Sequence, residues 1–253
     1  MIVGVVSYKG GVGKTTVTSN LAMNLRRLTQ TVSAIDLDDQ NALRLHFGLP
    51  FSLQKGIAMY ASPEDWRHVA RMSTSGVMVY PYGHVSAIQR LQFQQQLEMQ
   101  NSPLSVWLKN MRGNELVLID TPPGDNPAVR ETIRMADILL VILNTDGASF
   151  ATIGLIDELV RTYRPQLLYE NKMHYLLTDY DERSSMERAV YDAVRRVCAE
   201  RLAPLAIHHD TVLKEAFVSH ALLNEYNKNS QVLWEFERLS QWLLSKFKQG
   251  TSQ

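Results

Sequence analysis

The chain has 253 residues, of which 45% are hydrophobic and 21% are charged, and its formal net charge is zero. This composition is sufficient for one α/β domain with a full hydrophobic core, and the balanced charge gives no overall attraction to nucleic acid or to an anionic membrane. The single cysteine, Cys198, excludes an internal disulfide, and the longest purely apolar run, residues 138–143, is too short to cross a bilayer. We therefore expect a soluble, cytoplasmic protein.

The first predicted element is a buried strand at residues 2–6, and a glycine-rich loop follows it directly. The loop reads Lys9-Gly-Gly-Val-Gly-Lys-Thr-Thr16, and a helix is predicted over residues 15–28. Glycines allow backbone N–H groups to converge on an anion, and the helix N-terminus adds partial positive charge at the same place. Tyr8 stands where the usual phosphate-loop pattern has glycine. The strand, the loop and the helix together nevertheless favour nucleotide binding over a chance glycine loop.

The second predicted strand, residues 32–36, ends in an acidic run that contains Asp36, Asp38 and Asp39. Ligands of a parallel sheet flanked by helices bind beyond the carboxyl ends of its strands. An isolated Asp at such a place is more often a turn or cap residue. Beside a phosphate loop, however, this is where a carboxylate associated with Mg²⁺ is needed.

A later predicted strand, residues 116–120, also ends in an acid. Asp120 is its last residue, and Pro122-Pro123-Gly124 follows. Because the carboxyl ends of parallel strands share one edge of the sheet, Asp120 is expected near the phosphate loop. The stiff proline loop is suited to registering whether a third phosphate is present.

Short apolar runs alternate with longer amphipathic runs along the chain, and we find no linker or repeat. This pattern predicts right-handed crossovers and an α/β fold with a mostly parallel sheet and helices on both faces. We expect residues 1–253 to form a single domain that includes the last helix. The predicted strands are residues 2–6, 32–36, 77–80, 116–120, 138–143, 174–178 and 205–207. The predicted helices are residues 15–28, 88–109, 128–134, 150–164, 184–202 and 230–248.

The phosphate loop and the segments Asp36-Leu-Asp38 and Ile119-Asp-Thr-Pro-Pro123 together resemble the deviant Walker A ATPases of the ParA/MinD family. The similarity extends through residues 136–143 and 177–216, and so covers nearly the whole chain. It implies a P-loop NTPase fold, ATP and Mg²⁺ as cofactors, and a homodimer with two ATP molecules sandwiched between the subunits. In that family the extra lysine, which matches Lys9, reaches across the dimer to the ATP of the partner.

The resemblance also implies roles for single residues. Lys9, Lys14 and Asp38 match catalytic positions, and Asp38 matches the carboxylate that orients the attacking water. Asp39 replaces a proline that is common in this loop, and its negative charge should weaken ATP retention, so we expect slow or partner-dependent hydrolysis. The implied ATP-binding residues are Lys9, Gly10, Gly11, Val12, Gly13, Lys14, Thr15, Thr16, His208, His209 and Asp210. The implied Mg²⁺ residues are Thr15, Asp36, Asp38 and Asp120. For residues 208–210 an ordinary loop role is an equal alternative.

Within this family, several short segments resemble the BcsQ proteins of bacterial cellulose biosynthesis. These segments are residues 41–47, Gln54-Lys-Gly56, Asp65-Trp-Arg67 and Ile207-His-His-Asp210. The similarity implies a cytoplasmic regulatory or assembly subunit that acts with other cellulose-secretion subunits and meets the inner membrane only through them. A non-hydrolysing scaffold, in which ATP only holds the dimer together, is an alternative.

Two further alternatives are a ParA-like DNA partition ATPase and a MinD-like membrane-positioning ATPase. The predicted helix at residues 184–202 carries several arginines, but acidic neighbours indicate a solvated face of mixed charge, so we expect DNA binding to be weak. The last predicted helix, residues 230–248, is amphipathic and could insert into a membrane surface, but we expect it to pack on the sheet. The arginines of the helix are Arg188, Arg195, Arg196 and Arg201, with Arg183 just before it, and the acidic neighbours are Glu187, Asp192 and Glu200.

Overall fold

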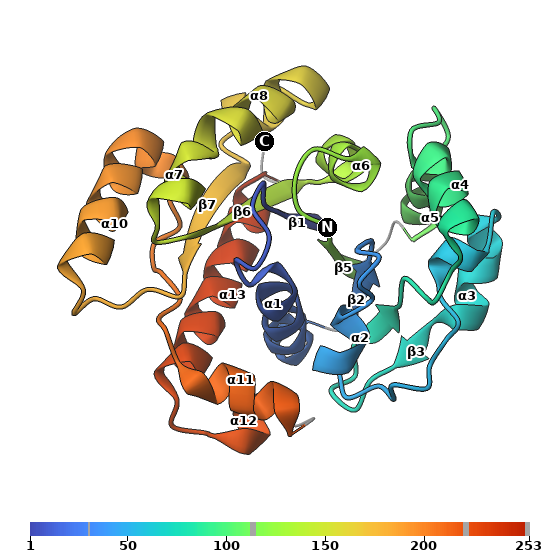
Figure 1. Ribbon diagram of the computed structural model, residues 1–253, viewed down its shortest axis with the longest axis horizontal. Coiled ribbons are helices and arrows are strands. Elements are labelled where there is room, and N and C mark those ends of the chain that lie inside the picture. The colour runs from blue at the N-terminus through green and yellow to red at the C-terminus, as the bar shows by residue number, and fades with distance from the viewer. Residues whose placement is uncertain (30, 112–114, 220–222, 251–253) are drawn as a thin grey trace.

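Seven strands form one sheet in the order β3-β4-β2-β5-β1-β6-β7 in the computed structural model, which describes residues 1–29, 31–111, 115–219 and 223–250 (Figure 1). All neighbouring strands are parallel except β3 and β4, which pair antiparallel at one edge. The predicted α/β fold with a mostly parallel sheet is therefore confirmed. The strands are β1 Ile2–Val6, β2 Thr31–Asp36, β3 Arg71–Met72, β4 Met78–Tyr80, β5 Glu115–Asp120, β6 Ile138–Asn144 and β7 Met173–Thr178.

Helices bury both faces of the sheet. Successive residues of a strand point to opposite faces, so Val3 and Val5 of β1 join one hydrophobic cluster while Ile2 and Val6 join clusters on the other side. Every residue of β1 is buried. This two-sided burial explains why the strands are continuously apolar in sequence instead of alternating.

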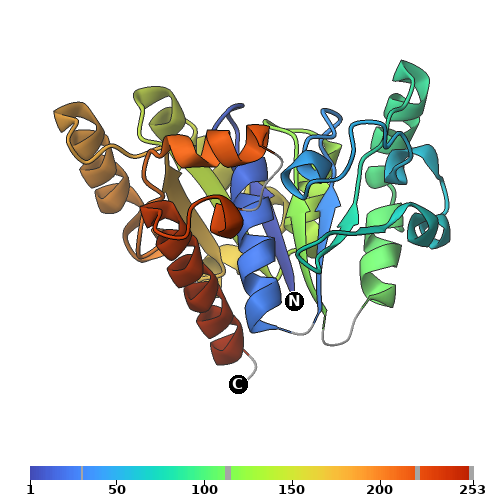
Figure 2. The same ribbon diagram turned by 90° about the horizontal axis from the view of Figure 1, so that it is seen from below.

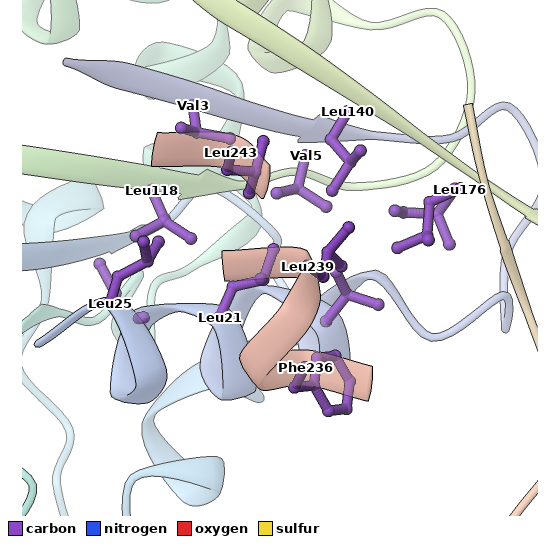
Figure 3. Close-up of a cluster of buried hydrophobic side chains, with 14 of the residues drawn as sticks. Val3, Val5, Leu21, Leu25, Leu118, Leu140, Leu176, Phe236, Leu239 and Leu243 are labelled. Carbon is purple, nitrogen blue, oxygen red and sulfur yellow. The ribbon is translucent and has the colours of Figure 1, made fainter. Parts of the chain in front are cut away.

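One face is covered by α1 (Lys14–Leu28) and α13 (Gln231–Gly250), which lie side by side (Figure 2). Figure 3 shows Leu21 of α1 and Leu239 of α13 between these helices and the strand residues of this cluster, which also includes Phe236 of α13. Phe236 and Leu239 are completely buried, whereas Trp234 on the outer side of α13 is 54% exposed. The expectation that the last helix packs on the sheet is confirmed. No helix in the described part of the chain is long and apolar enough to cross a membrane.

The opposite face carries two groups of helices. Phe93 of α4 and Trp107 of α5 pack over β2, β4 and β5, and a second group that includes Ile133 and Val160 packs over β1, β6 and β7. The helices of the first group are α4 Ala87–Leu97 and α5 Pro103–Asn110. Those of the second group are α6 Pro127–Met135, α8 Ile153–Tyr163 and α10 Ser185–Cys198.

Three predicted elements differ from the structure. The single helix expected at residues 88–109 is broken into α4 and α5, because Ser102 caps α5 and Pro103 begins it. The helix expected at residues 150–164 is divided at Thr152 between α7 (Gly147–Ala151) and α8. Residues 205–207 do not form a strand. They follow Pro204 and make only scattered backbone bonds to the β7 region, such as Ile207 N to Leu177 O at 2.9 Å.

Several short helices were not predicted. The longest of them, α11 (Thr211–Val218), begins at Asp210, whose side chain accepts a hydrogen bond from the amide of Val212. The other short α-helices are α2 Leu43–His46, α3 Trp66–Val69, α9 Gln166–Tyr169 and α12 Leu223–Tyr226. The 3-10 helices are η1 Ile57–Met59, η2 Pro63–Asp65 and η3 Ala199–Arg201.

Candidate functional site

The glycine-rich loop joins the carboxyl end of β1 to the N-terminus of α1. Gly11 and Gly13 have φ angles of 75° and 86°, in the left-handed region that favours glycine. Gly13 precedes α1 without providing a side-chain cap. The first amides of α1 are therefore available to an anionic ligand, as expected for a phosphate loop.

The proline loop after β5 lies against this glycine-rich loop. The Thr121 hydroxyl donates to Val5 O at 2.9 Å, and the Gly124 amide donates to Ser7 O at 3.0 Å. A Cβ atom built on Gly10 would stand 3.7 Å from Cγ of Pro123. The loop that was expected to register a third phosphate is therefore in contact with the loop that was expected to bind it.

Two buried carboxylates and one buried ammonium group meet at the ends of β2, β5 and β1. Asp36 and Asp120 are 0% and 1% exposed, and Lys14 is 6% exposed. Burial lowers the pKa of Lys14, although the nearby charges of Asp120 and Asp38 oppose this. Burial also raises the pKa of Asp120 to about 7, against the effects of Thr15 and Lys14. Lys14 therefore offsets the cost of ionising Asp120 only in part.

The oxygens of the two buried carboxylates are used differently. Asp36 accepts hydrogen bonds from the amides of Asp38 and Leu43, at 3.0 and 3.1 Å, and so fixes the loop after β2. Asp120 Oδ1 accepts from the Thr18 hydroxyl at 3.3 Å, whereas its buried Oδ2 has no hydrogen-bond partner among the residues that the structure describes. A buried carboxylate oxygen without a partner is costly and fits a cation or a cation-bound water.

The protein provides only part of a coordination shell for such a cation. No group of three or more His, Cys, Asp or Glu side chains in the described ranges is arranged to hold a metal ion. Mg²⁺ usually keeps several waters and binds through one or two protein oxygens together with phosphates. The donor set around Asp120 and Thr15 fits that mode of binding.

Lys9 forms an ion pair with an acid that follows β6. Its Nζ lies 2.6 Å from Oδ2 of Asp146, the N-cap residue of α7 beyond the end of β6. Asp146 also accepts a hydrogen bond from the amide of Ser149 at 2.7 Å. Both members of the ion pair are partly exposed, so Lys9 lies at the surface of the carboxyl edge.

A cavity of about 420 Å³ opens beside the glycine-rich loop. Its lining includes His208 and Asp210, as the sequence suggested for a base-binding region. His209 is not among the lining residues, and its ring pairs instead with Asp179 at 2.6 Å. The cavity volume is in the range of small-molecule sites.

The wall of this cavity also contains residues that were not predicted. His46 of α2 and Phe217 of α11 line the cavity, with their ring centroids 4.4 Å apart. Burial lowers the pKa of His46 to about 4, so this ring is neutral near physiological pH. Thr178, at the end of β7, also lines the cavity and donates to Val12 O of the glycine-rich loop at 2.8 Å.

Helix α13 and the residue before it contact two residues of this wall. The His208 ring and the Glu235 carboxylate are 2.6 Å apart, and the Ser230 hydroxyl donates to Asp210 at 3.0 Å. Both oxygens of Asp210 are engaged, one with Ser230 and one with the amide of Val212. Asp210 therefore shapes the wall and caps α11.

Three of the five arginines considered for DNA binding pair with an acidic side chain or a backbone oxygen. Arg201 forms a partly buried ion pair with Asp157 at 2.6 Å, and Arg183 pairs with Asp181 at 2.9 Å. Arg188 donates to the backbone oxygen of Glu182. Four of the five arginines are exposed, namely Arg183, Arg188, Arg195 and Arg196, and the last three lie on α10.

Comparisons with known proteins agree with this architecture. The family model described as "Cellulose biosynthesis protein BcsQ" matches residues 1–244. The "Cellulose biosynthesis protein BcsQ" of Salmonella typhimurium is 29% identical over 96% of this chain and 94% of its own length. Cobyrinic acid a,c-diamide synthase from Mycobacterium smegmatis, solved with ADP and magnesium, has a TM-score of 0.77 at 19% identity and covers 98% of this chain and 96% of its own. The septum site-determining protein MinD from Pyrococcus horikoshii, solved with Mg-ADP, has a TM-score of 0.72 at 21% identity. The match covers 96% of this chain and 95% of the MinD chain. The two solved structures confirm the fold.

Proposed function

Because the chain belongs to the cellulose biosynthesis protein BcsQ family, we propose that it is an ATP-binding protein that assists bacterial cellulose biosynthesis and secretion as a nucleotide-dependent dimer. In this proposal it acts in the cytoplasm as a regulatory or assembly subunit. Other secretion subunits recruit it to the inner membrane, and DNA is not its partner. The observation that carries the proposal is the buried oxygen of Asp120, beside Lys14 and the phosphate loop, for which the described part of the chain offers no hydrogen-bond partner.

ATP fits the site by its phosphates and by its size. In the proposed complex, residues 10–16 surround the phosphates with backbone amides, and Lys14 binds the β- and γ-phosphates. The 420 Å³ cavity on the other side of the loop would hold the base. The solved relatives that contain ADP and magnesium support this choice of ligand.

Each acid of the site then has a separate task. Thr15 and Asp120 would hold Mg²⁺, and the ion would neutralise charge on the phosphates. Asp36 fixes the loop after β2 through the amides of Asp38 and Leu43. Asp38, which is partly exposed on that loop, is then free to orient a water molecule toward the third phosphate.

Turnover separates an ATPase from a non-hydrolysing scaffold. We expect slow phosphate release from the wild-type protein with Mg-ATP, and at least about tenfold slower release from Asp38→Ala, because a positioned base contributes at least that much. The assay is run with and without the other cellulose-secretion subunits. Equal, negligible rates for both proteins under both conditions would show that ATP serves only to assemble the dimer.

Lys9 provides the test of dimerisation. Its surface position beside Asp146 allows it to reach the nucleotide of a second subunit, where it would add positive charge to the phosphates. We expect Lys9→Ala to keep ATP affinity within about threefold but to weaken ATP-dependent dimerisation at least about tenfold, since each dimer loses two charge-assisted contacts. Sedimentation with Mg-ATP and with Mg-ADP measures the proportions of monomer and dimer in each nucleotide state.

Asp146→Asn is the companion variant. Asparagine still caps α7 but no longer forms the ion pair with Lys9, so dimerisation should strengthen about two- to fivefold. Lys172→Ala, which breaks the exposed pair with Glu170, is the matched control and should change nothing. A dimer that is unaffected by Lys9→Ala would refute the role of Lys9 in trans.

A further inference from the structure

Asp39 is the one acid of the loop after β2 to which the proposed function assigns no role. It directly follows Asp38 and stands where related proteins commonly have proline. Its side chain is 27% exposed. An uncompensated charge at this point would repel the phosphates of a bound nucleotide.

The structure supplies a compensating charge from a distant segment. Arg90 of α4 donates from Nη1 to Oδ2 of Asp39 at 2.5 Å, and the two residues are 51 positions apart in sequence. Arg90, whose side chain is 44% exposed, is the cationic partner of Asp39 within the described ranges of the chain, and Gln40 Nε2 donates to the other oxygen, Oδ1, at 3.2 Å. The ion pair therefore joins α4 to the loop that carries Asp38.

Helix α4 is a firm support for this arginine. Its N-terminus has a complete capping box between Ser86 and Gln89. Its buried residue Phe93 packs edge-on against Tyr82, with ring centroids 5.6 Å apart. Arg90 is therefore presented from a fixed helix rather than from a flexible loop.

The connection from β4 to α4 is also held tightly. The amides of Ile57 and Ala58 donate to the carbonyl oxygens of Pro81 and Tyr82, at 2.8 and 3.0 Å. The backbones approach so closely that a Cβ atom on Gly56 would lie 2.2 Å from the amide nitrogen of Gly83. Burial and, to a smaller extent, the charge of Asp39 raise the pKa of Tyr82, so its hydroxyl adds no negative charge beside the acidic loop.

We propose that Arg90 is a positioning residue that neutralises Asp39 and thereby allows the Asp38 loop to face a third phosphate, so that it sets the preference for ATP over ADP. The inference rests on the proposed nucleotide-binding function. The third phosphate adds negative charge at the end of the nucleotide nearest this loop, and ADP lacks it. Loss of Arg90 should therefore weaken ATP binding more than ADP binding.

The test compares affinities for a non-hydrolysable ATP analogue and for ADP, each with Mg²⁺, by calorimetric titration. We expect Arg90→Gln to lower the affinity for the ATP analogue about two- to fivefold, which is the size expected for a partly exposed ion pair. The affinity for ADP should stay within the experimental error of the wild-type value. Arg90→Lys should restore most of the loss. The double variant Arg90→Gln with Asp39→Asn should return to the wild-type ratio, because it removes both charges. Raising the salt concentration should reduce the difference.

Arg183→Gln is the matched control, because it also breaks an exposed ion pair, with Asp181, and should leave both affinities unchanged. If Arg90→Gln weakened the binding of both nucleotides equally, the role of Arg90 would be merely structural and the inference would be overturned. Unchanged affinities in Arg90→Gln would also overturn it, as would a double variant in which Asp39→Asn failed to restore the ratio of ATP to ADP affinity. These outcomes leave the proposed function intact. Failure of the wild-type protein to bind either nucleotide would instead refute the proposed function and the inference together.

Discussion

Replacing Lys14 with alanine should abolish ATP binding at micromolar concentrations, with a loss of affinity of at least about 100-fold. Lys14 is buried between the phosphate loop and the acids at the ends of β2 and β5, where its ammonium group faces Asp120 and Asp38. A charge-assisted hydrogen bond contributes about 1.5–3 kcal/mol, and loss of this cation also leaves those acids to repel the phosphates. Titration with Mg-ATP measures the effect.

The fold should survive this change, because Lys14 occupies the first turn of α1 and the apolar side of that helix is untouched. Thermal unfolding of Lys14→Ala without nucleotide should therefore resemble that of the wild type, and only the stabilisation by added Mg-ATP should disappear. Lys172→Ala removes a lysine of an exposed pair and should keep that stabilisation. Wild-type affinity in Lys14→Ala would exclude the phosphate loop as the nucleotide site.

Removal of the last helix should prevent folding. Truncation after Asn229 exposes the face of the sheet that α13 covers, including its contacts with Leu21 of α1. The milder variant Phe236→Ala should lower the free energy of unfolding by about 3–5 kcal/mol, because it leaves a cavity at a fully buried position. Urea unfolding followed by circular dichroism measures this loss.

Trp234→Ala is the control on the same helix. Its ring is 54% exposed and contacts the Arg238 guanidinium 4.7 Å from the ring centroid, so we expect a loss of about 1 kcal/mol or less. A folded protein after truncation at Asn229, with a cooperative unfolding transition, would contradict the core role of α13. It would also reopen the possibility that this helix is a membrane-binding segment.

The features that are local in sequence were predicted well. The strand, the glycine loop and the start of α1 are adjacent, so their pattern was sufficient to predict their arrangement. Asp36 and Asp120 were expected at one edge because each ends a parallel strand, and Asp36 pairs in register with Asp120. The roles proposed for these acids depend on bound ligand and stay predictions.

The features that depend on distant segments were missed. His46 and Phe217 meet only because α2 and α11 both reach the cavity, and no periodicity indicates such a contact. The effect of Asp39 was predicted from its charge alone, since a partner 51 residues away cannot be recognised from one sequence. The break between α4 and α5 was different. Ser102-Pro103 is a local signal for a helix start. It was missed because the amphipathic pattern continues on both sides of it, and one long helix was therefore predicted.

The interior position of β1 has a consequence for the order in which the protein folds. The amide of Ile2 donates to the Asp137 carboxylate across 135 residues of sequence, and Val12 O of the phosphate loop accepts from the Thr178 hydroxyl across 166 residues. Strand β1, which precedes the other described strands in the chain, therefore cannot be paired on both sides until β5 and β6 have left the ribosome. Such non-local pairing makes folding slow and leaves an apolar strand exposed in the nascent chain. The phosphate loop is complete only late in synthesis, so nucleotide can stabilise the finished protein but not its early intermediates.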